Sequence, residues 1–234
     1  MNNSVRTVSD AKRAFYGTHT RPINSIYRRV VEELMVEMHL LSVHQNFVYD
    51  ALYALGITTT FDRFMQSYRP ESDVAPIFSA LCSSVGLDSA KVRSDSERLL
   101  GALAGASWEG LLKGDVSGEL GTVMGQVQNN PNFKYSRLFA IGAYRVMEEI
   151  DADALKDNEK FKTAVEAVAT TLKLIPDKVQ KDLELYRGNL DKLNAAAVAI
   201  ADTIAADRKK RAEREQERAA AAEKAEKKDE TTAV

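Results

Sequence analysis

The segment EELMVEMHLLSVH, residues 32–44, has the residue types of a metal site. It holds three carboxylates and two of the three histidines in the chain. Carboxylates and imidazoles are the ligands that zinc and iron commonly take in proteins. In a di-iron helical bundle these ligands come partly as Glu-x-x-His pairs on facing helices. The spacing therefore decides between a metalloenzyme and an ordinary amphipathic helix.

These side chains do not converge on one site of a straight helix. At about 100° per residue, Glu33, Glu37 and His44 fall within about 40° of one another, whereas His39 falls near Arg28. Glu-x-x-His is missing, and so is the His-Glu-x-x-His motif of zinc proteases. We therefore expect no metal or other cofactor here, and neither histidine on the core face. We expect the carboxylates and His44 to be solvated or paired with neighbouring arginines.

No other motif predicts catalysis. The chain lacks the P-loop, the dinucleotide-binding signature and the nucleophile elbow. Its single cysteine, Cys82, stands in an apolar helical segment and is expected to fill space in the core. The third histidine, His19, has no cysteine near it in the sequence. We expect no catalytic residues; the alternative is a helical metalloenzyme, which near-stoichiometric metal in the purified protein would support.

The composition is that of a globular protein with little overall charge. The 234 residues carry a net charge of −2, and 44% of them are hydrophobic. This balance argues against a nucleic-acid binder. No apolar run approaches the roughly 18 residues of a membrane-spanning helix. The chain starts without an apolar signal segment or an Arg- and Ser-rich leader, so we expect a protein that acts where it is made.

A local excess of positive charge stands near the N-terminus. Residues 1–29 contain six cationic residues and one acidic residue, a local charge of +5. The candidate partner-binding residues, here called the basic patch, are Lys12, Arg13, Arg21, Arg28 and Arg29. Such a patch fits an acidic protein partner or an anionic lipid surface. The alternative is a solvated surface without a partner.

Helical periods fill the sequence, and strand signals are scarce. Asp50, Asp73 and Asp88 are expected to cap helices that follow them. Residues 101–130 contain seven glycines, several of them four apart, which would line up as a smooth seam on a helix. Each glycine costs a soluble helix about 1 kcal/mol relative to alanine. We therefore expect this segment to be helical in pieces and the least stable part of the domain.

The pattern changes after residue 176. Apolar residues then follow the 4–3 spacing typical of a coiled coil, at Val179, Leu183, Tyr186, Leu190, Leu193, Ala197, Ile200 and Ile204. Beyond this point the chain is rich in Lys, Arg, Glu and Ala, with no apolar stripe. The sequence thus predicts an all-α protein. It would have a globular domain at 1–175, a long helix packing on it at 176–205, and a charged helical or frayed tail at 206–234.

Two segments resemble a known family. Residues 7–71, from TVSDAKRAFYGT to MQSYRPE, are similar to the N-terminal signature of the thylakoid formation proteins, also called photosystem II biogenesis proteins. Residues 130–149, NPNFKYSRLFAIGAYRVMEE, are similar to a second signature of that family. The resemblance covers most of residues 7–200 and does not include the charged tail. Ala51 and Ser67 depart from the family pattern, in which proline and glycine are common there.

The resemblance implies a function that the residue patterns alone do not predict. It implies an all-helical, non-enzymatic auxiliary factor that associates with the thylakoid FtsH protease complex and supports its accumulation. Photosystem II repair and thylakoid biogenesis would depend on it through that protease. The expected location is the cytoplasmic face of the cyanobacterial thylakoid, as a peripheral protein that is partly soluble in the cytoplasm. No nucleic acid and no small-molecule substrate is expected; a general helical scaffold for another acidic partner is the alternative.

Overall fold

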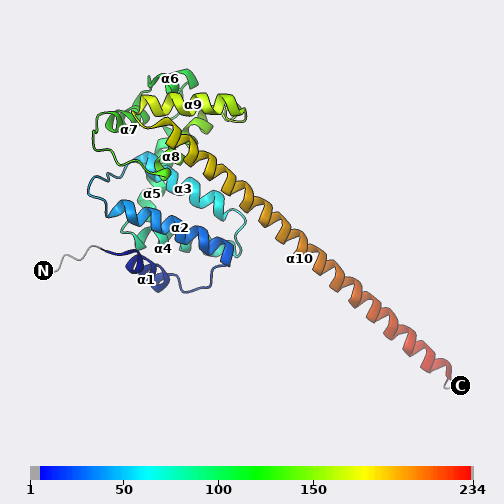
Figure 1. The fold of residues 1–234 in the computed structure, drawn as a ribbon. Helices are drawn as coiled ribbons and strands as arrows, with labels where there is room; N and C mark the ends of the chain where they lie inside the picture. The colour runs from blue at the N-terminus through cyan, green and yellow to red at the C-terminus, as the bar shows by residue number, and fades with distance from the viewer. Residues whose placement is uncertain (1–5, 233–234) are drawn as a thin grey trace. The chain divides into compact units, whose positions relative to one another are not determined.

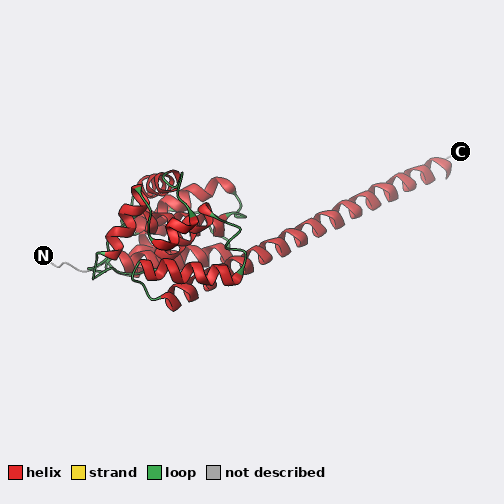
Figure 2. Cartoon of the chain, turned by 90° about the horizontal axis from the view of Figure 1, so that it is seen from above, coloured by secondary structure: helices red, strands yellow, loops and turns green. Residues whose placement is uncertain are grey.

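The computed structural model describes residues 6–232, with side chains outside that description at residue 201 and from residue 215 onward. The expectations for residues 1–5, and those for side chains beyond residue 214, therefore lie outside the described residues. Within them, all regular structure is helical, which confirms the all-α prediction (Figure 2). The elements, labelled in Figure 1, are α1 (Val8–Thr18), α2 (Ser25–Ser42), α3 (Ala51–Met65), η1 (Glu71–Asp73), α4 (Val74–Ser84), α5 (Ser89–Gly101), α6 (Trp108–Lys113), α7 (Gly118–Gln128), α8 (Arg137–Ile150), α9 (Asn158–Thr171) and α10 (Pro176–Thr232).

The chain forms two compact units, Met1–Gly188 and Asn189–Val234. In the first unit, the beginning of α10 is anchored by buried Val179, Leu183 and Tyr186. In the second unit, Ile200 and Ile204 are exposed, so the predicted burial as far as Ile204 is wrong. Residues 195–206 include seven alanines, whose short side chains offer little apolar area to bury. The domain boundaries at 175 and 205 stay predictions.

Short polar side chains fix where several helices begin. Asp50 accepts a hydrogen bond from the Tyr53 amide at 2.7 Å, and Asp88 accepts one from the Ala90 amide at 2.9 Å. Both capping predictions are thereby confirmed. Asp73 precedes α4 but makes no side-chain cap, because its carboxylate accepts a hydrogen bond from Arg21 instead.

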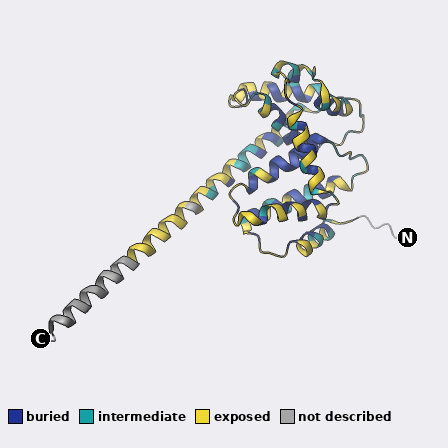
Figure 3. Ribbon diagram, turned by 180° about the vertical axis from the view of Figure 1, so that it is seen from behind, coloured by how far each residue is buried: buried dark blue, intermediate teal, exposed yellow. Residues whose placement is uncertain are grey.

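Helix α3 is the centre of the first unit. Thirteen of its fifteen residues are buried, so it is covered on every side, as expected of a helix that is apolar all round. Helices α8 and α5 pack along it, and α2 packs against α1, α3 and α4. Figure 3 shows the buried residues gathered on these inner helices and the exposed ones on the outer turns.

The backbones of α3 and α8 approach each other closely inside the first unit. A Cβ atom added to Gly56 would lie 1.8 Å from the carbonyl oxygen of Leu138. One added to Gly142 would lie 1.9 Å from the carbonyl oxygen of Leu52. Neither distance is possible for real atoms, so only glycine at both positions allows the two helices to cross at this separation.

The glycine-rich segment behaves differently from the predicted seam. It forms the short helices α6 and α7, as "helical in pieces" predicts. However, added Cβ atoms at Gly101, Gly105, Gly118 and Gly125 would meet nothing within 4 Å. These glycines therefore mark turns and helix ends, or simply face open space, and do not form a packing surface.

We expect Gly56→Ala and Gly142→Ala each to destabilise the protein by about 3 kcal/mol or more, at the upper end of overpacking effects. The added methyl group meets a backbone carbonyl, so the clash is relieved only if α3 and α8 move apart. Urea unfolding followed by circular dichroism measures the change in the free energy of unfolding.

Gly125→Ala is the matched control. It lies inside α7 with open space around it, and alanine is the better helix former, so this variant should gain up to about 1 kcal/mol. Equal effects of the three substitutions on stability would contradict the close crossing.

The cap of α3 predicts a pH dependence. Burial raises the pKa of Asp50 to about 6, above the value of about 3.9 in an unfolded chain. Because the folded protein holds the Asp50 proton more tightly than the unfolded chain does, protonated Asp50 stabilises the fold at low pH. This stabilisation is lost as the pH rises through about 6. Asn at this position keeps a good cap but does not titrate. Asp50→Asn should therefore gain stability relative to the parent protein between about pH 4 and pH 7, measured by urea unfolding at each pH; a constant difference would contradict this.

Candidate partner-binding surface

Helix α1 is held on α2 by the carboxylate of Glu32. The ammonium group of Lys12 donates to it at 2.7 Å, and the hydroxyl of Tyr16 donates to it at 2.6 Å. These two hydrogen bonds lower the pKa of Glu32, that from Lys12 most. Burial and then the bond to Glu32 raise the pKa of Tyr16 to about 12. Lys12 of the basic patch is thus part of a helix–helix contact.

Arg21, in the segment between α1 and α2, makes a second internal contact. Its guanidinium donates to Asp73, whose side chain is only 5% exposed. A carboxylate this deeply buried needs a charged partner to offset its desolvation. Arg21 therefore also stabilises the fold by neutralising Asp73, although most of the Arg21 side chain is exposed.

The other three members of the basic patch face outward. Arg13 and Arg29 are 80% and 82% exposed, and Arg28 is exposed on the same helix as Arg29. Arg13 pairs with Asp10 at 3.2 Å and Arg29 with Glu33 at 2.8 Å, both one helical turn away. Exposed pairs of this kind hold a side chain only weakly. We name Arg13, Arg28 and Arg29 the outward arginines, because a partner can reach them.

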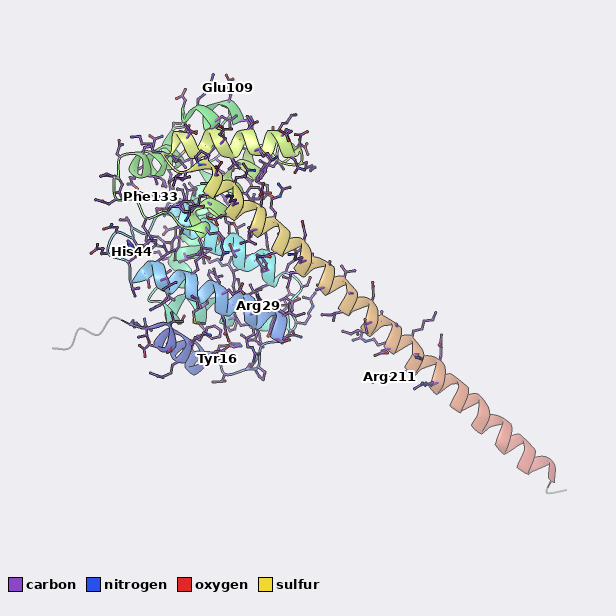
Figure 4. The ribbon with its side chains drawn as sticks, viewed as in Figure 1. Tyr16, Arg29, His44, Glu109, Phe133 and Arg211 are labelled. Carbon is purple, nitrogen blue, oxygen red and sulfur yellow. The ribbon has the colours of Figure 1, made fainter. Side chains whose placement is uncertain are left out.

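A shallow hollow lies beside the outward arginines on α2. It is lined by Ser25, Arg28, Arg29, Glu32 and Glu33. Figure 4 labels Tyr16 on α1 and Arg29 on α2, two helices that pack against each other. Glu32 thus joins the two helices that carry most of the basic patch, and the role of the patch in partner binding stays a prediction.

Two of the three carboxylates of the opening segment, Glu33 and Glu37, are paired with arginines, as predicted. Glu33 accepts from Arg29, and Glu37 accepts from two nitrogens of Arg137, at 2.6 and 3.2 Å. The Nδ1 atom of His44 accepts from the Asn46 amide at 3.1 Å. Within the described part of the chain, no three His, Cys, Asp or Glu residues gather closely enough to hold a metal ion.

One expectation for this segment is wrong. His39 is only 3% exposed, although it was predicted to lie off the core face. The prediction followed the apolar stripe of α2 alone. In the structure α2 packs against α1, α3 and α4, so more than one side of the helix is covered.

Cys82 fills space in the core, as predicted. Its side chain is fully buried in α4, and burial raises the pKa of its thiol to about 12. The thiol is therefore protonated near neutral pH, in which state it is a poor nucleophile.

A groove next to α2 was not predicted from the sequence. It is lined by Glu37, Leu40, Leu41, Tyr135, Ser136, Arg137, Lys178 and Asp182. The hydroxyl of Tyr135 donates to Asp182 at 2.8 Å, and Leu40 is 57% exposed at the groove. The sequence did contain one sign of this groove. The two segments that resemble the thylakoid formation proteins, residues 7–71 and 130–149, meet here through the Glu37–Arg137 ion pair.

The two histidines of α2 should differ in their effect on stability. His39→Ala removes most of a buried side chain and should cost about 2 kcal/mol or more. His44→Ala removes a half-buried side chain and one hydrogen bond, and should cost about 1 kcal/mol or less. Thermal unfolding of the two variants measures the difference, and equal costs would contradict the burial of His39.

No helix within the described residues combines the length and the apolar character needed to cross a membrane.

Comparison with known proteins gives one consistent result. The family model for the thylakoid formation protein matches residues 7–215. The chain is 51% identical to Protein Thf1 of Nostoc punctiforme over 222 residues, which covers 92% of this chain and 94% of the relative. It is also 51% identical to Protein Thf1 of Gloeothece citriformis, with coverage of 89% and 96%.

A solved structure agrees with the sequence relatives. The chain is similar to Psb29, determined at 1.55 Å, with a TM-score of 0.76 and 40% sequence identity. The match covers 88% of this chain and 99% of the Psb29 chain, and it shares the all-α architecture. The chain therefore belongs to the thylakoid formation protein family, which is implicated in thylakoid formation and photosystem II biogenesis.

Proposed function

We propose that this protein is a non-enzymatic auxiliary factor for thylakoid biogenesis and for photosystem II assembly and repair. It acts by associating with thylakoid FtsH proteases and supporting their accumulation. The observation that carries the proposal is the family match over residues 7–215, together with relatives that share about half of their residues with this chain. The protease as partner follows from the resemblance of the two signature segments to this family.

The surface of α1 and α2 supports a binding role. Its outward arginines have no buried carboxylate to neutralise them, unlike Arg21. Arg13 and Arg29 are held by exposed carboxylates, which a partner can displace at small cost, and Arg28 is exposed to solvent. An acidic protein surface or the anionic headgroups of the thylakoid would both be attracted to them over about a Debye length. In this proposal the protein is peripheral, on the cytoplasmic face of the membrane.

Charge reversal of the outward arginines tests the proposed contact. Arg13→Glu, Arg28→Glu and Arg29→Glu in one chain should lower the amount of FtsH that co-purifies from cyanobacterial thylakoids by about tenfold. The fold should survive, since exposed charges contribute little to stability. Immunoblotting of FtsH after affinity purification at low salt gives the measurement.

The control changes the same charge elsewhere. Lys156→Glu, Lys160→Glu and Lys162→Glu reverse three cations at the start of α9 and in the turn before it. This triple variant should co-purify FtsH as the parent protein does. Equal recovery with both triple variants would show that the basic patch is an ordinary solvated surface.

A further inference from the structure

The second unit presents large apolar side chains to solvent. Val198, Ile200 and Ile204 of α10 are 61%, 43% and 48% exposed. An exposed isoleucine side chain lacks the stabilisation that burial of its apolar surface would give. Two isoleucines one turn apart, on a segment otherwise made largely of alanine and charged residues, form a small apolar site that a partner can cover.

The same side of the helix becomes basic one turn later. At about 100° per residue, Ile200, Ile204, Arg208 and Arg211 fall within about 80° of one another. These four side chains are exposed, and so is Asp207, which lies about 20° outside this span, beside Ile200. We name these residues the docking face; Figure 4 labels Arg211 on it.

The neighbouring cations point elsewhere. Lys209 and Lys210 each lie more than about 100° from the middle of the docking face. Lys209 forms an ion pair with Glu213, at 4.0 Å, away from the docking face. The apolar and basic residues of the docking face are therefore combined on one side of the helix, where the two arginines outnumber the single carboxylate of Asp207.

The width of the docking face indicates what kind of partner covers it. Ile200, Ile204, Asp207 and Arg211 keep the 4–3 register that begins at Val179, and Arg208 lies one residue outside it. A narrow seam of this spacing is the pattern by which one helix receives another. A lipid surface takes a broader apolar face, often with aromatic residues, and residues 195–214 contain no aromatic residue. The alanines beside the seam leave room for a second helix backbone to approach closely.

We propose that the docking face binds an amphipathic helix of a partner protein that is apolar at one end and acidic at the other. Its apolar residues cover Ile200 and Ile204, and its carboxylates pair with Arg208 and Arg211. Charge complementarity sets the register, because a basic partner segment would meet two arginines. This inference does not depend on FtsH being the partner.

Two double variants of the full-length protein test the docking face. Arg208→Glu with Arg211→Glu reverses the basic end of the face, whereas Lys209→Glu with Lys210→Glu makes the same change of charge on other sides of the helix. The probe is a synthetic fluorescent peptide of four heptads, with leucine at the a and d positions of two heptads and glutamate at those of the other two. Both orders of the heptads are made, so that parallel and antiparallel binding are covered.

Fluorescence anisotropy should show peptide binding that weakens about tenfold or more with the arginine pair reversed and less than about twofold with the lysine pair reversed. Ile200→Ser with Ile204→Ser should also weaken it about tenfold, with unchanged helix content by circular dichroism. Equal weakening by the two charge variants would overturn the proposal, since attraction would then be diffuse. Failure of the parent protein to bind either peptide, with binding to phosphatidylglycerol vesicles instead, would also overturn it in favour of a lipid surface.

Discussion

The backbone contact between Gly56 and Gly142 sets the separation of α3 and α8, and the arrangement of the first unit follows from it. Helix α3 is buried almost completely because α8 lies directly on it and other helices cover its remaining sides. The two segments that carry the family resemblance each supply one of these glycines. The same two segments meet again at the surface, through the Glu37–Arg137 ion pair and the groove beside it. The two segments that resemble the family are therefore the two that pack against each other at one interface of the fold.

The charges of the N-terminal region divide into two groups with different roles. Lys12 forms an ion pair with Glu32, and Arg21 forms one with Asp73. Both pairs join elements of the first unit. Arg13, Arg28 and Arg29 are paired with exposed carboxylates or lie open to solvent. A count of charges along the sequence treats all five alike. The burial of their carboxylate partners separates the residues that stabilise the fold from those that remain available to a partner.

Local patterns in the sequence predict local structure well here. Helical periods give the all-α class, and Asp50 and Asp88 cap the helices that follow them because a short carboxylate reaches the free amides of the first turn. Most of the missed features of the first unit depend on contacts between distant segments. The crossing at Gly56 and Gly142 joins residues 86 positions apart. The burial of His39 depends on the three helices that pack against α2. Asp73 does not cap α4, because its side chain accepts a hydrogen bond from Arg21. The groove beside α2 likewise joins three separate elements, and the protease partner comes from family resemblance alone.

The proposed role rests on support of FtsH accumulation, and the most direct test measures the protease itself. The measurement is the amount of FtsH in thylakoids of a cyanobacterial strain from which the gene for this protein has been deleted, before and after exposure to strong light. We expect FtsH to fall in the deletion strain and the full-length protein to restore it. Unchanged FtsH, with a defect in photosystem II recovery, would contradict the account and place the action of this family elsewhere.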